Sequence, residues 1–321
     1  MITIFAYSKE EGFRHFVEAE RLGPLLADKR NLIWVDLEAA TSEEAVILSR
    51  DFSFHPLAIE DCIAETLLPK VDDFDDYIFL VLHGSRTTSD QTFTTAEINF
   101  FLGNNYLVTY HDQPSRSISR SKERCLKLGP AMTQGADFLL HDILDGLVDN
   151  YFPILNQYDE AIDRIEAEVF TNPTPSTLNK IFTLKREITH LRRVTGPQRD
   201  ILNRLSRDHC RVISSKAAIY YRDVYDHLVR IADLSEAYRD LISGAMEAYL
   251  SVVSNRLNEI MKILTVFTAV MMPLTLITGI YGMNFVHMPE LNTRYGYYSI
   301  LGIMFLIAIG MFSYFRKKKW V

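Results

Sequence analysis

Two long apolar segments near the C-terminus constrain this chain more than any other feature of its sequence. Residues 263–280 and 297–315 contain no charged side chain. A helix needs roughly 20 apolar residues to cross the core of a bilayer, so each segment is almost long enough by itself. Aromatic residues flank both segments, and the basic run Arg316-Lys-Lys-Lys319 follows the second. This pattern is typical of membrane helices and predicts two of them.

The basic run also predicts the orientation of the chain. Such clusters tend to remain on the cytoplasmic side of the membrane. Two crossings then place the first 260 residues and the tail at 316–321 in the cytoplasm, and only the loop at 282–296 faces out. The N-terminus lacks the basic start of a secretory signal peptide. We therefore expect a multi-pass protein of the cell (inner) membrane with both termini cytoplasmic, in contact with lipids.

The composition excludes several classes of function. With 34 Lys and Arg against 41 Asp and Glu, the net charge of −7 argues against nucleic-acid binding. Cys62, Cys125 and Cys210 are scattered, so they predict neither a disulfide framework nor a zinc site. No nucleophile–base grouping or phosphate-binding glycine loop is present. We expect no enzyme and no organic substrate.

The first 130 residues have the pattern of an α/β domain. The sequence Thr41-Ser-Glu-Glu44 has the spacing of a capping box and predicts a helix to about Phe52. A second helix is expected after His55-Pro56. Short apolar or alternating runs bounded by turn residues predict strands at 2–7, 31–37, 77–83, 94–102 and 106–110.

Long helices are predicted for the rest of the soluble part. Apolar residues recur at steps of three and four from Phe138 to Val169, and residues 172–176 then break the chain. Antiparallel helices are therefore expected within 131–215, with a stop or kink at Gly196-Pro197. No proline occurs between Ala217 and Pro273. This predicts one helix over 216–281, which forms a stalk and continues into the first membrane span.

A stripe of polar and apolar residues follows one face of that helix. Its members are separated by 3, 3, 4, 4 and 3 residues, which confines them to an arc of about 120°. Such a stripe in a membrane segment indicates either a water-accessible lining or a surface that packs against another helix, and the phase does not decide between them. The stripe consists of Asn258, Met261, Leu264, Thr268, Met272 and Thr275.

The segment after the first span carries a specific motif. Tyr281-Gly-Met-Asn-Phe285 is followed by Met288-Pro-Glu-Leu291, a second span and a lysine-rich tail. In this combination the chain resembles the CorA family of magnesium and cobalt transport proteins. The resemblance covers essentially the whole chain and extends to residues 55–61, 69–71, 221–227 and 249–256.

The resemblance implies an α+β membrane protein that forms a pentameric funnel. A homopentamer of cytoplasmic α/β domains and stalk helices would surround a pore lined by the first membrane helix, so the stripe becomes a pore lining. Gly282, Met283 and Asn284 would form the selectivity filter at the outer mouth. The ion would be Mg²⁺, both transported and regulatory, with Co²⁺ also possible. Glu290 in the outer loop would concentrate cations or be surface charge without a role.

The resemblance also implies metal-sensing sites in the cytoplasm. Asp61 and Glu60 match the family's sensing positions, and Asp223 and Asp145 match their respective partners. These residues meet across neighbouring protomers in the family. Mg²⁺ bound there at high concentration would hold the pore closed.

Two other functions remain open from the sequence. A zinc transporter of the ZntB type shares the Gly-Met-Asn motif, although Met288-Pro-Glu-Leu291 and the paired acidic residues favour the magnesium branch. A membrane-anchored sensor could bind Mg²⁺ without conducting it, although the polar residues of the first span argue against this.

Overall fold

The computed structural model describes residues 1–16, 21–64, 68–87, 93–127, 130–207, 210–284, 288 and 293–320. The chain divides into two compact units. The first unit contains Met1–Ala167 and Ser176–Ala245, and the second contains Glu168–Pro175 and Met246–Val321.

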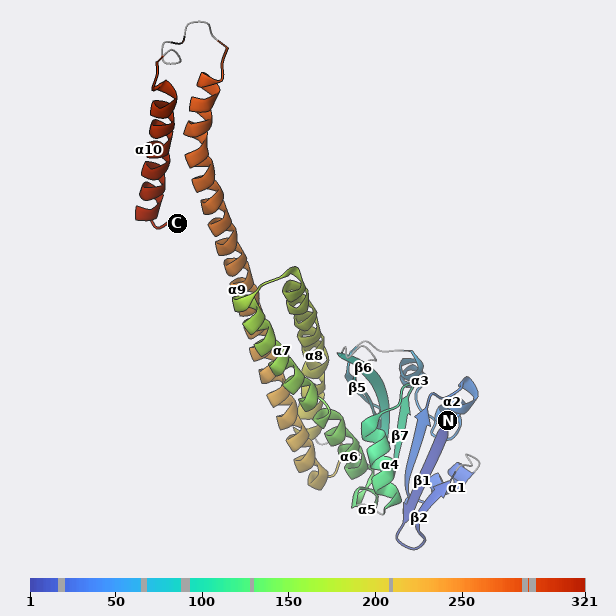
Figure 1. Ribbon diagram of the computed structural model, residues 1–321. Helices are drawn as coiled ribbons and strands as arrows, with labels where there is room; N and C mark the ends of the chain where they lie inside the picture. Colours follow the sequence, from blue (N-terminus) through green and yellow to red (C-terminus); the bar gives the residue numbers. More distant parts are fainter. Residues whose placement is uncertain are drawn as a thin grey trace. The chain divides into compact units, whose positions relative to one another are not determined.

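A mixed sheet forms the centre of the first unit (Figure 1). The strand order is β2-β1-β3-β7-β6-β5-β4. All neighbours are antiparallel except β3 and β7, which are parallel. The strands are β1 (Ile2–Ser8), β2 (Gly12–Phe16), β3 (Leu32–Glu38), β4 (Lys70–Asp73), β5 (Tyr77–Thr87), β6 (Phe93–Gly103) and β7 (Tyr106–His111).

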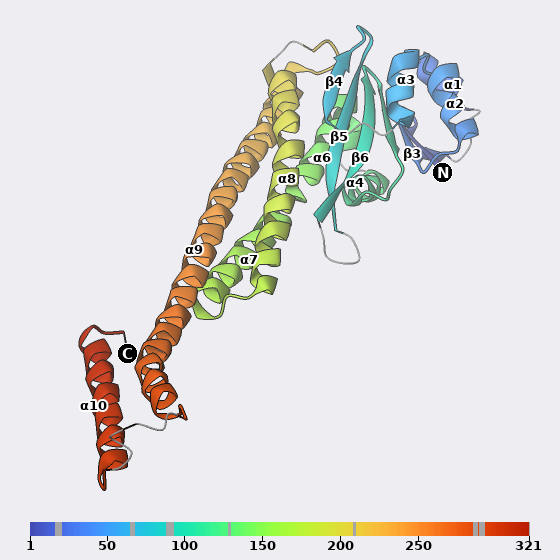
Figure 2. The ribbon, with the colours of Figure 1, turned by 90° about the horizontal axis from the view of Figure 1, so that it is seen from above.

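Helices cover both faces of this sheet (Figure 2). One layer contains α1 (Leu22–Ala27), α2 (Ser42–Arg50) and α3 (Pro56–Ile63), and the other contains α4 (Arg116–Leu126), α5 (Pro130–Gln134) and α6 (Ala136–Asp149). Successive side chains of a strand point to opposite faces. Ile33 and Val35 therefore pack with the first layer, while Trp34 and Asp36 face the second. This places a buried carboxylate, Asp36, between the sheet and α4.

The predicted strands and the two helices predicted for the first 130 residues, α2 and α3, are present in the structure, whereas the sequence did not predict α1 and α4. The capping box is complete, because the Thr41 hydroxyl accepts from the Glu44 amide and the Glu44 carboxylate accepts from the Thr41 amide. His55 caps α3 by accepting from the Leu57 amide at 3.2 Å. The sequence did not predict β2 and β4. Both are short strands at the edges of the sheet, and Lys70–Asp73 holds a single apolar residue, so no alternating pattern marks it.

Long helices complete the first unit. They are α7 (Phe152–Thr171), α8 (Pro175–Arg207) and α9 (Ser215–Tyr281). Only the part of α9 up to Ala245 belongs to the first unit. Of the stop or kink expected at Gly196-Pro197, the stop is wrong, because α8 continues through this dipeptide to Arg207. Buried residues on both sides, including Val194 and Ile201, hold the helix in place. Packing of the buried apolar side chains of α8 thus outweighs the low helix propensity of glycine and proline.

The second unit contains the rest of α9 and α10 (Gly296–Lys317). Both helices are long and apolar enough to span a membrane. The most apolar window of α9 is not buried in the single chain, and only 6% of that of α10 is. A helix that is apolar on all sides needs lipid or other protein to cover it.

Candidate functional site

An open groove follows one face of α9 in the second unit. Three residues of the predicted stripe, Thr268, Met272 and Thr275, line it together with Phe267, Met271, Leu276, Gly279, Ile280 and Met283. The other three members, Asn258, Met261 and Leu264, are exposed on the same helix nearer its N-terminus. The groove therefore presents hydroxyl and thioether groups in a largely apolar surface.

The threonine hydroxyls of this groove are arranged to accept hydrogen bonds. Thr268 Oγ1 donates to the Leu264 carbonyl, and Thr275 Oγ1 donates to the Met271 carbonyl, each at 2.9 Å. Because each hydroxyl proton is already used, only its oxygen lone pairs remain available. Water molecules bound to a cation point their hydrogens outward, so these oxygens suit a hydrated cation.

The Gly-Met-Asn motif begins at the end of α9. The Gly282 amide donates to the Thr278 carbonyl at 2.9 Å. A Cβ atom at position 282 would lie 3.1 Å from that same oxygen, and the backbone there is not in the left-handed region. Glycine is therefore favoured by close approach rather than by a left-handed turn. Asn284, two residues further on, is exposed.

Acidic and histidine side chains meet between α6 and α9 in the first unit. Asp145 and Asp149 lie one turn apart on α6, and their ligand atoms and one of His227 all fall within 4.8 Å of one another. Burial and the neighbouring Asp149 raise the pKa of Asp145, and the charge of Asp223 adds to this. Carboxylate oxygens and an imidazole nitrogen form a donor set that suits a divalent cation.

The other two predicted metal-binding residues lie on α3. The Asp61 carboxylate accepts a hydrogen bond from the ammonium group of Lys70, which is also 3.0 Å from Asp72. Burial opposes the charge on Lys70, but the hydrogen bonds to these two acids raise its pKa overall. Glu60 is exposed. A cation that binds Asp61 must therefore compete with an ammonium group already present.

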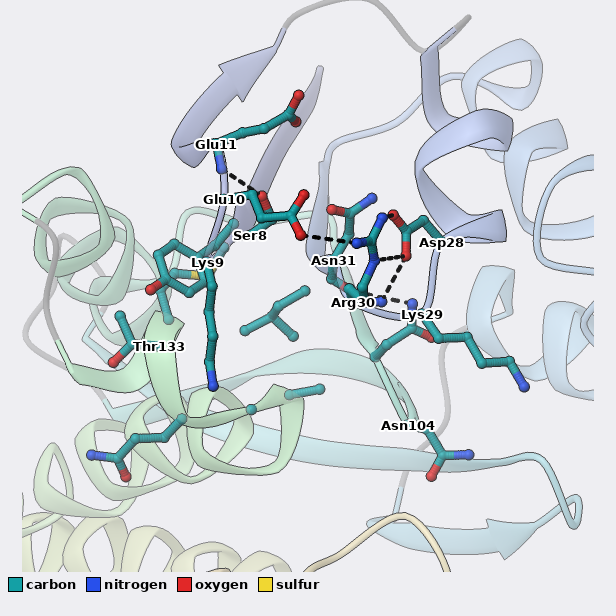
Figure 3. A pocket seen from close by; sticks show the side chains of 17 residues that line it. Ser8, Lys9, Glu10, Glu11, Asp28, Lys29, Arg30, Asn31, Asn104 and Thr133 are labelled. Atoms are coloured by element: carbon teal, nitrogen blue, oxygen red, sulfur yellow. Dashed lines mark hydrogen bonds and ion pairs between the residues drawn. The ribbon is translucent and has the colours of Figure 1, made fainter.

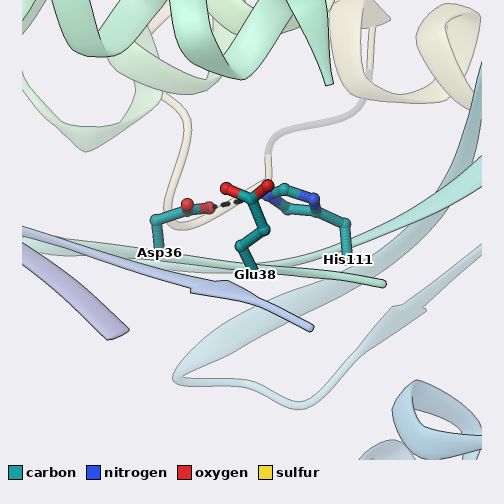
Figure 4. Close-up of side chains that lie close together, drawn as sticks. All are labelled: Asp36, Glu38 and His111. Atoms are coloured by element: carbon teal, nitrogen blue, oxygen red, sulfur yellow. Dashed lines mark hydrogen bonds and ion pairs between the residues drawn. The ribbon is translucent and has the colours of Figure 1, made fainter. Parts of the chain in front are cut away.

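A buried ion network lies under α4 (Figure 4). His111 Nδ1 is 2.7 Å from the Gln113 carbonyl, and its Nε2 is 3.2 Å from Asp36 Oδ1. Both ring nitrogens face acceptors, an arrangement that favours the doubly protonated ring, and Asp36 raises the pKa of His111 against the opposing effect of burial. Lys122 contacts Asp36 and lies 3.8 Å from Glu38. Two cations thus balance two carboxylates, which indicates a structural network rather than a metal site.

A polar pocket lies beside the turn between β1 and β2 (Figure 3). Arg30 donates to Asp28 through Nε and Nη2, and to Glu10 at 2.9 Å. Three cationic side chains, Lys9, Lys29 and Arg30, line the pocket with three acidic ones, Glu10, Glu11 and Asp28, so its formal net charge is zero.

Comparison with known proteins identifies the family. A family model described as "CorA-like Mg2+ transporter protein" matches residues 29–317. The chain belongs to this family. It is 37% identical to the cobalt/magnesium transport protein CorA of Thermotoga maritima, over all of this chain and 92% of that protein. It is also 37% identical to the putative metal ion transporter YfjQ of Bacillus subtilis, over all of this chain and 98% of that protein.

A solved structure shares the fold. The complete structure of the CorA magnesium transporter from Methanocaldococcus jannaschii matches with a TM-score of 0.85 and 23% identity, over 99% of this chain and 98% of that one. The CorA-like family comprises membrane transporters rather than enzymes. Membership therefore accounts for the N-terminal α/β domain, the long helix and the two apolar C-terminal helices together.

Sequence reasoning missed part of the acidic cluster of this CorA-like chain. It selected Asp145 and Asp223 but not Asp149 or His227. The i, i+4 spacing of Asp145 and Asp149 was visible, yet only the fold shows that His227 of α9 faces them. It also missed Lys70 as the partner of Asp61. Glu290 lies outside the described residues.

Proposed function

We propose that five copies of this chain form a channel-like transporter for Mg²⁺, and also Co²⁺, across the cell membrane. The groove of α9 carries this proposal, because its acceptor hydroxyls and apolar side chains end at the Gly-Met-Asn motif. Five such faces around one axis enclose a pathway of the right chemistry. The apolar side chains of Met261, Leu264 and Met272 form a constriction that blocks ions when it is dry.

Asn284 is suited to select a hydrated dication. Mg²⁺ loses its water reluctantly and keeps a nearly octahedral shell. A ring of neutral amide oxygens accepts hydrogen bonds from that shell without removing it. Five carboxylates would bind the ion too tightly for release, whereas conduction needs weak and multiple sites.

Mg²⁺ in the cytoplasm regulates the pore through the acidic residues. Asp61 of one protomer pairs with Asp223 of its neighbour, and Glu60 pairs with Asp145. Two carboxylates about 4 Å apart repel by about 4 kcal/mol at an effective dielectric constant near 20. Bound Mg²⁺ reverses this repulsion and holds the ring closed, and its release loosens the ring and lets the constriction fill with water. Burial is the main cause of the raised pKa of Asp145, and the nearby carboxylates of Asp149 and Asp223 raise it further.

Metal uptake into liposomes that contain the purified protein tests the transport proposal. Mg²⁺ and Co²⁺ should enter and compete with each other, and Asn284→Ala should reduce Mg²⁺ entry at least tenfold while the assembly stays intact. Entry of Zn²⁺ without Mg²⁺ would instead favour the ZntB-like function. Binding of Mg²⁺ without entry of any metal would indicate a sensor.

A second uptake experiment tests the regulation. High Mg²⁺ on the cytoplasmic side should stop uptake by the wild type, and Asp223→Lys or Asp61→Ala should continue to transport under that condition. Asp226→Ala, an exposed acid on the same helix as Asp223, serves as the matched control. Normal closure of both site variants would contradict the regulatory role.

A further inference from the structure

A cavity in the first unit has a chemistry that ion transport does not use. Its volume is about 560 Å³, and residues of β5, β6 and α4 and of the junction between α6 and α7 line it. This volume falls within the range of small-molecule sites. The cavity combines an apolar floor with a cationic rim.

Small side chains leave room above the floor of the cavity. Ile98, Leu147 and Ile154 are buried and provide apolar surface. Gly84 and Ala96 lie beside them, and a Cβ atom at Gly84 would lie 3.6 Å from Ile98 and 3.7 Å from Leu147. The floor therefore offers a contact surface for a flat apolar group.

The rim carries uncompensated positive charge. Arg86, Arg116 and Arg120 line it, against one carboxylate, Glu123. Arg86 donates to the neutral side chain of Gln113 at 3.0 Å, and no ion pair joins Arg116 or Arg120 to any residue that the structure describes. Three arginines against one acid leave a charge of 3 − 1 = +2 in a chain whose net charge is −7.

Arginine is the residue that best recognises phosphate. Its planar guanidinium donates two parallel hydrogen bonds to phosphate oxygens. Hydroxyl groups of Ser115, Ser117 and Ser119 also line the rim, and hydroxyls bind the same oxygens. The nearest other acid of α6, Asp142, is already engaged by Ser121 and Arg124.

We infer that this cavity binds an organic phosphate with a flat apolar group, such as a nucleoside polyphosphate. The arginines of the rim hold the phosphates, and the ring system lies on the floor formed by Ala96, Ile98 and Leu147. The ligand is a bound effector rather than a transported substrate.

The cavity shares one helix end with the acidic cluster. Leu147 and Asn150 line the cavity, whereas Asp145 and Asp149 belong to the cluster. At 100° per residue these two pairs point to different sides of the helix axis. The inference does not depend on the proposed transport, since binding is measured without ion flux.

Calorimetry on the full chain in detergent and magnesium-free buffer tests the inference. ATP should bind saturably, and both tripolyphosphate, which lacks the ring, and adenosine, which lacks the phosphates, should bind at least tenfold more weakly. Arg116→Gln combined with Arg120→Gln should weaken ATP binding at least tenfold, as expected when charge-assisted hydrogen bonds are lost. The absence of saturable ATP binding, or an unchanged affinity of this double variant, would overturn the inference.

A second pair of variants separates the floor from the rim. Ala96→Phe fills the floor, so it should weaken ATP binding to the level of tripolyphosphate and leave the weak binding of tripolyphosphate unchanged. Arg164→Gln, at an exposed arginine of α7 outside the cavity, should bind ATP normally. The midpoint of thermal unfolding reports whether each variant is folded. Equal binding of ATP and tripolyphosphate by the wild type, or normal ATP binding by folded Ala96→Phe, would refute a role for the floor.

Discussion

Lys70 is the residue that sets how easily a cation reaches Asp61. Its ammonium group is held by Asp61 and by Asp72. These groups are partly exposed, so solvent screening limits their ion pair to about 1 kcal/mol or less. Mg²⁺ must displace this ammonium to bind Asp61 in the proposed regulatory site.

Replacing Lys70 should therefore make the transporter close at lower Mg²⁺. We predict that Lys70→Met lowers the cytoplasmic Mg²⁺ concentration for half-maximal closure about threefold, which corresponds to the modest energy of a partly exposed ion pair. Uptake into liposomes at graded Mg²⁺ measures this concentration. Lys185→Met, at an exposed lysine of α8, is the control. If Lys70→Met leaves the Mg²⁺ concentration for half-maximal closure unchanged or raises it, this lysine does not compete with the metal.

The network around Asp36 should make stability depend on pH. Burial alone would raise the pKa of Asp36, but His111 and Lys122 outweigh it and lower that pKa. Burial opposes the charge on His111 as well, but Asp36 raises its pKa. The charged His111 ring thus contributes fully to the free energy of unfolding below its ordinary pKa of 6.5, and this contribution is lost as the pH rises through the raised pKa. The ionised Asp36 contributes fully to the free energy of unfolding above its ordinary pKa of 3.8, and this contribution is lost as the pH falls through the lowered pKa.

Asp36→Asn tests this network directly. The substitution leaves the buried His111 and the partly buried Lys122 without their main partner, which typically costs about 3–5 kcal/mol and lowers the midpoint of thermal unfolding by roughly 10 °C. It should also remove the loss of stability that is expected as the pH rises through the raised pKa of His111. Glu38→Gln is the matched control, because this carboxylate is partly exposed and 3.8 Å from Lys122. Equal midpoints for Asp36→Asn and the wild type would mean that the network is not stabilising.

At the scale of elements, α9 combines a soluble helix with a membrane span. The face of α9 that is proposed to line the pore predicts which positions are accessible to water. In a Cys210→Ser background, in which Cys62 and Cys125 are buried, Thr275→Cys should lose most of its Mg²⁺ uptake when treated with a charged thiol reagent. Ile277→Cys lies about 200° around the helix and should be unaffected. Equal sensitivity at the two positions would argue against a lining face.

The sequence predicted elements well where periodicity is strong and burial is one-sided. It predicted α9 because no proline interrupts it before Pro273, and α2 because Thr41 and Glu44 form a capping box. It failed for β4, whose residues Lys70–Asp73 are mostly charged, and at Pro197, where packing holds α8 together. Local patterns do not contain tertiary partners, and the pairing of Asp61 with Lys70 and of Asp149 with His227 depends on such partners.

At the scale of the whole molecule, the central claim is that the pathway is shared among subunits. The membrane helices of a single chain are apolar and almost entirely exposed. The proposed closed ring of identical copies would cover such surfaces and would place Asn284 of every copy at one mouth. One defective copy should then impair the complete ring.

Mg²⁺ uptake by mixed assemblies tests this claim most directly. Wild-type and Asn284→Ala chains are co-expressed in equal amounts, purified together and reconstituted into liposomes. If five copies share one pathway, only about 3% of the rings contain wild-type chains alone, and uptake should fall far below one half. If each chain has its own pathway, uptake should be about one half of the wild-type value, and that result would contradict the account.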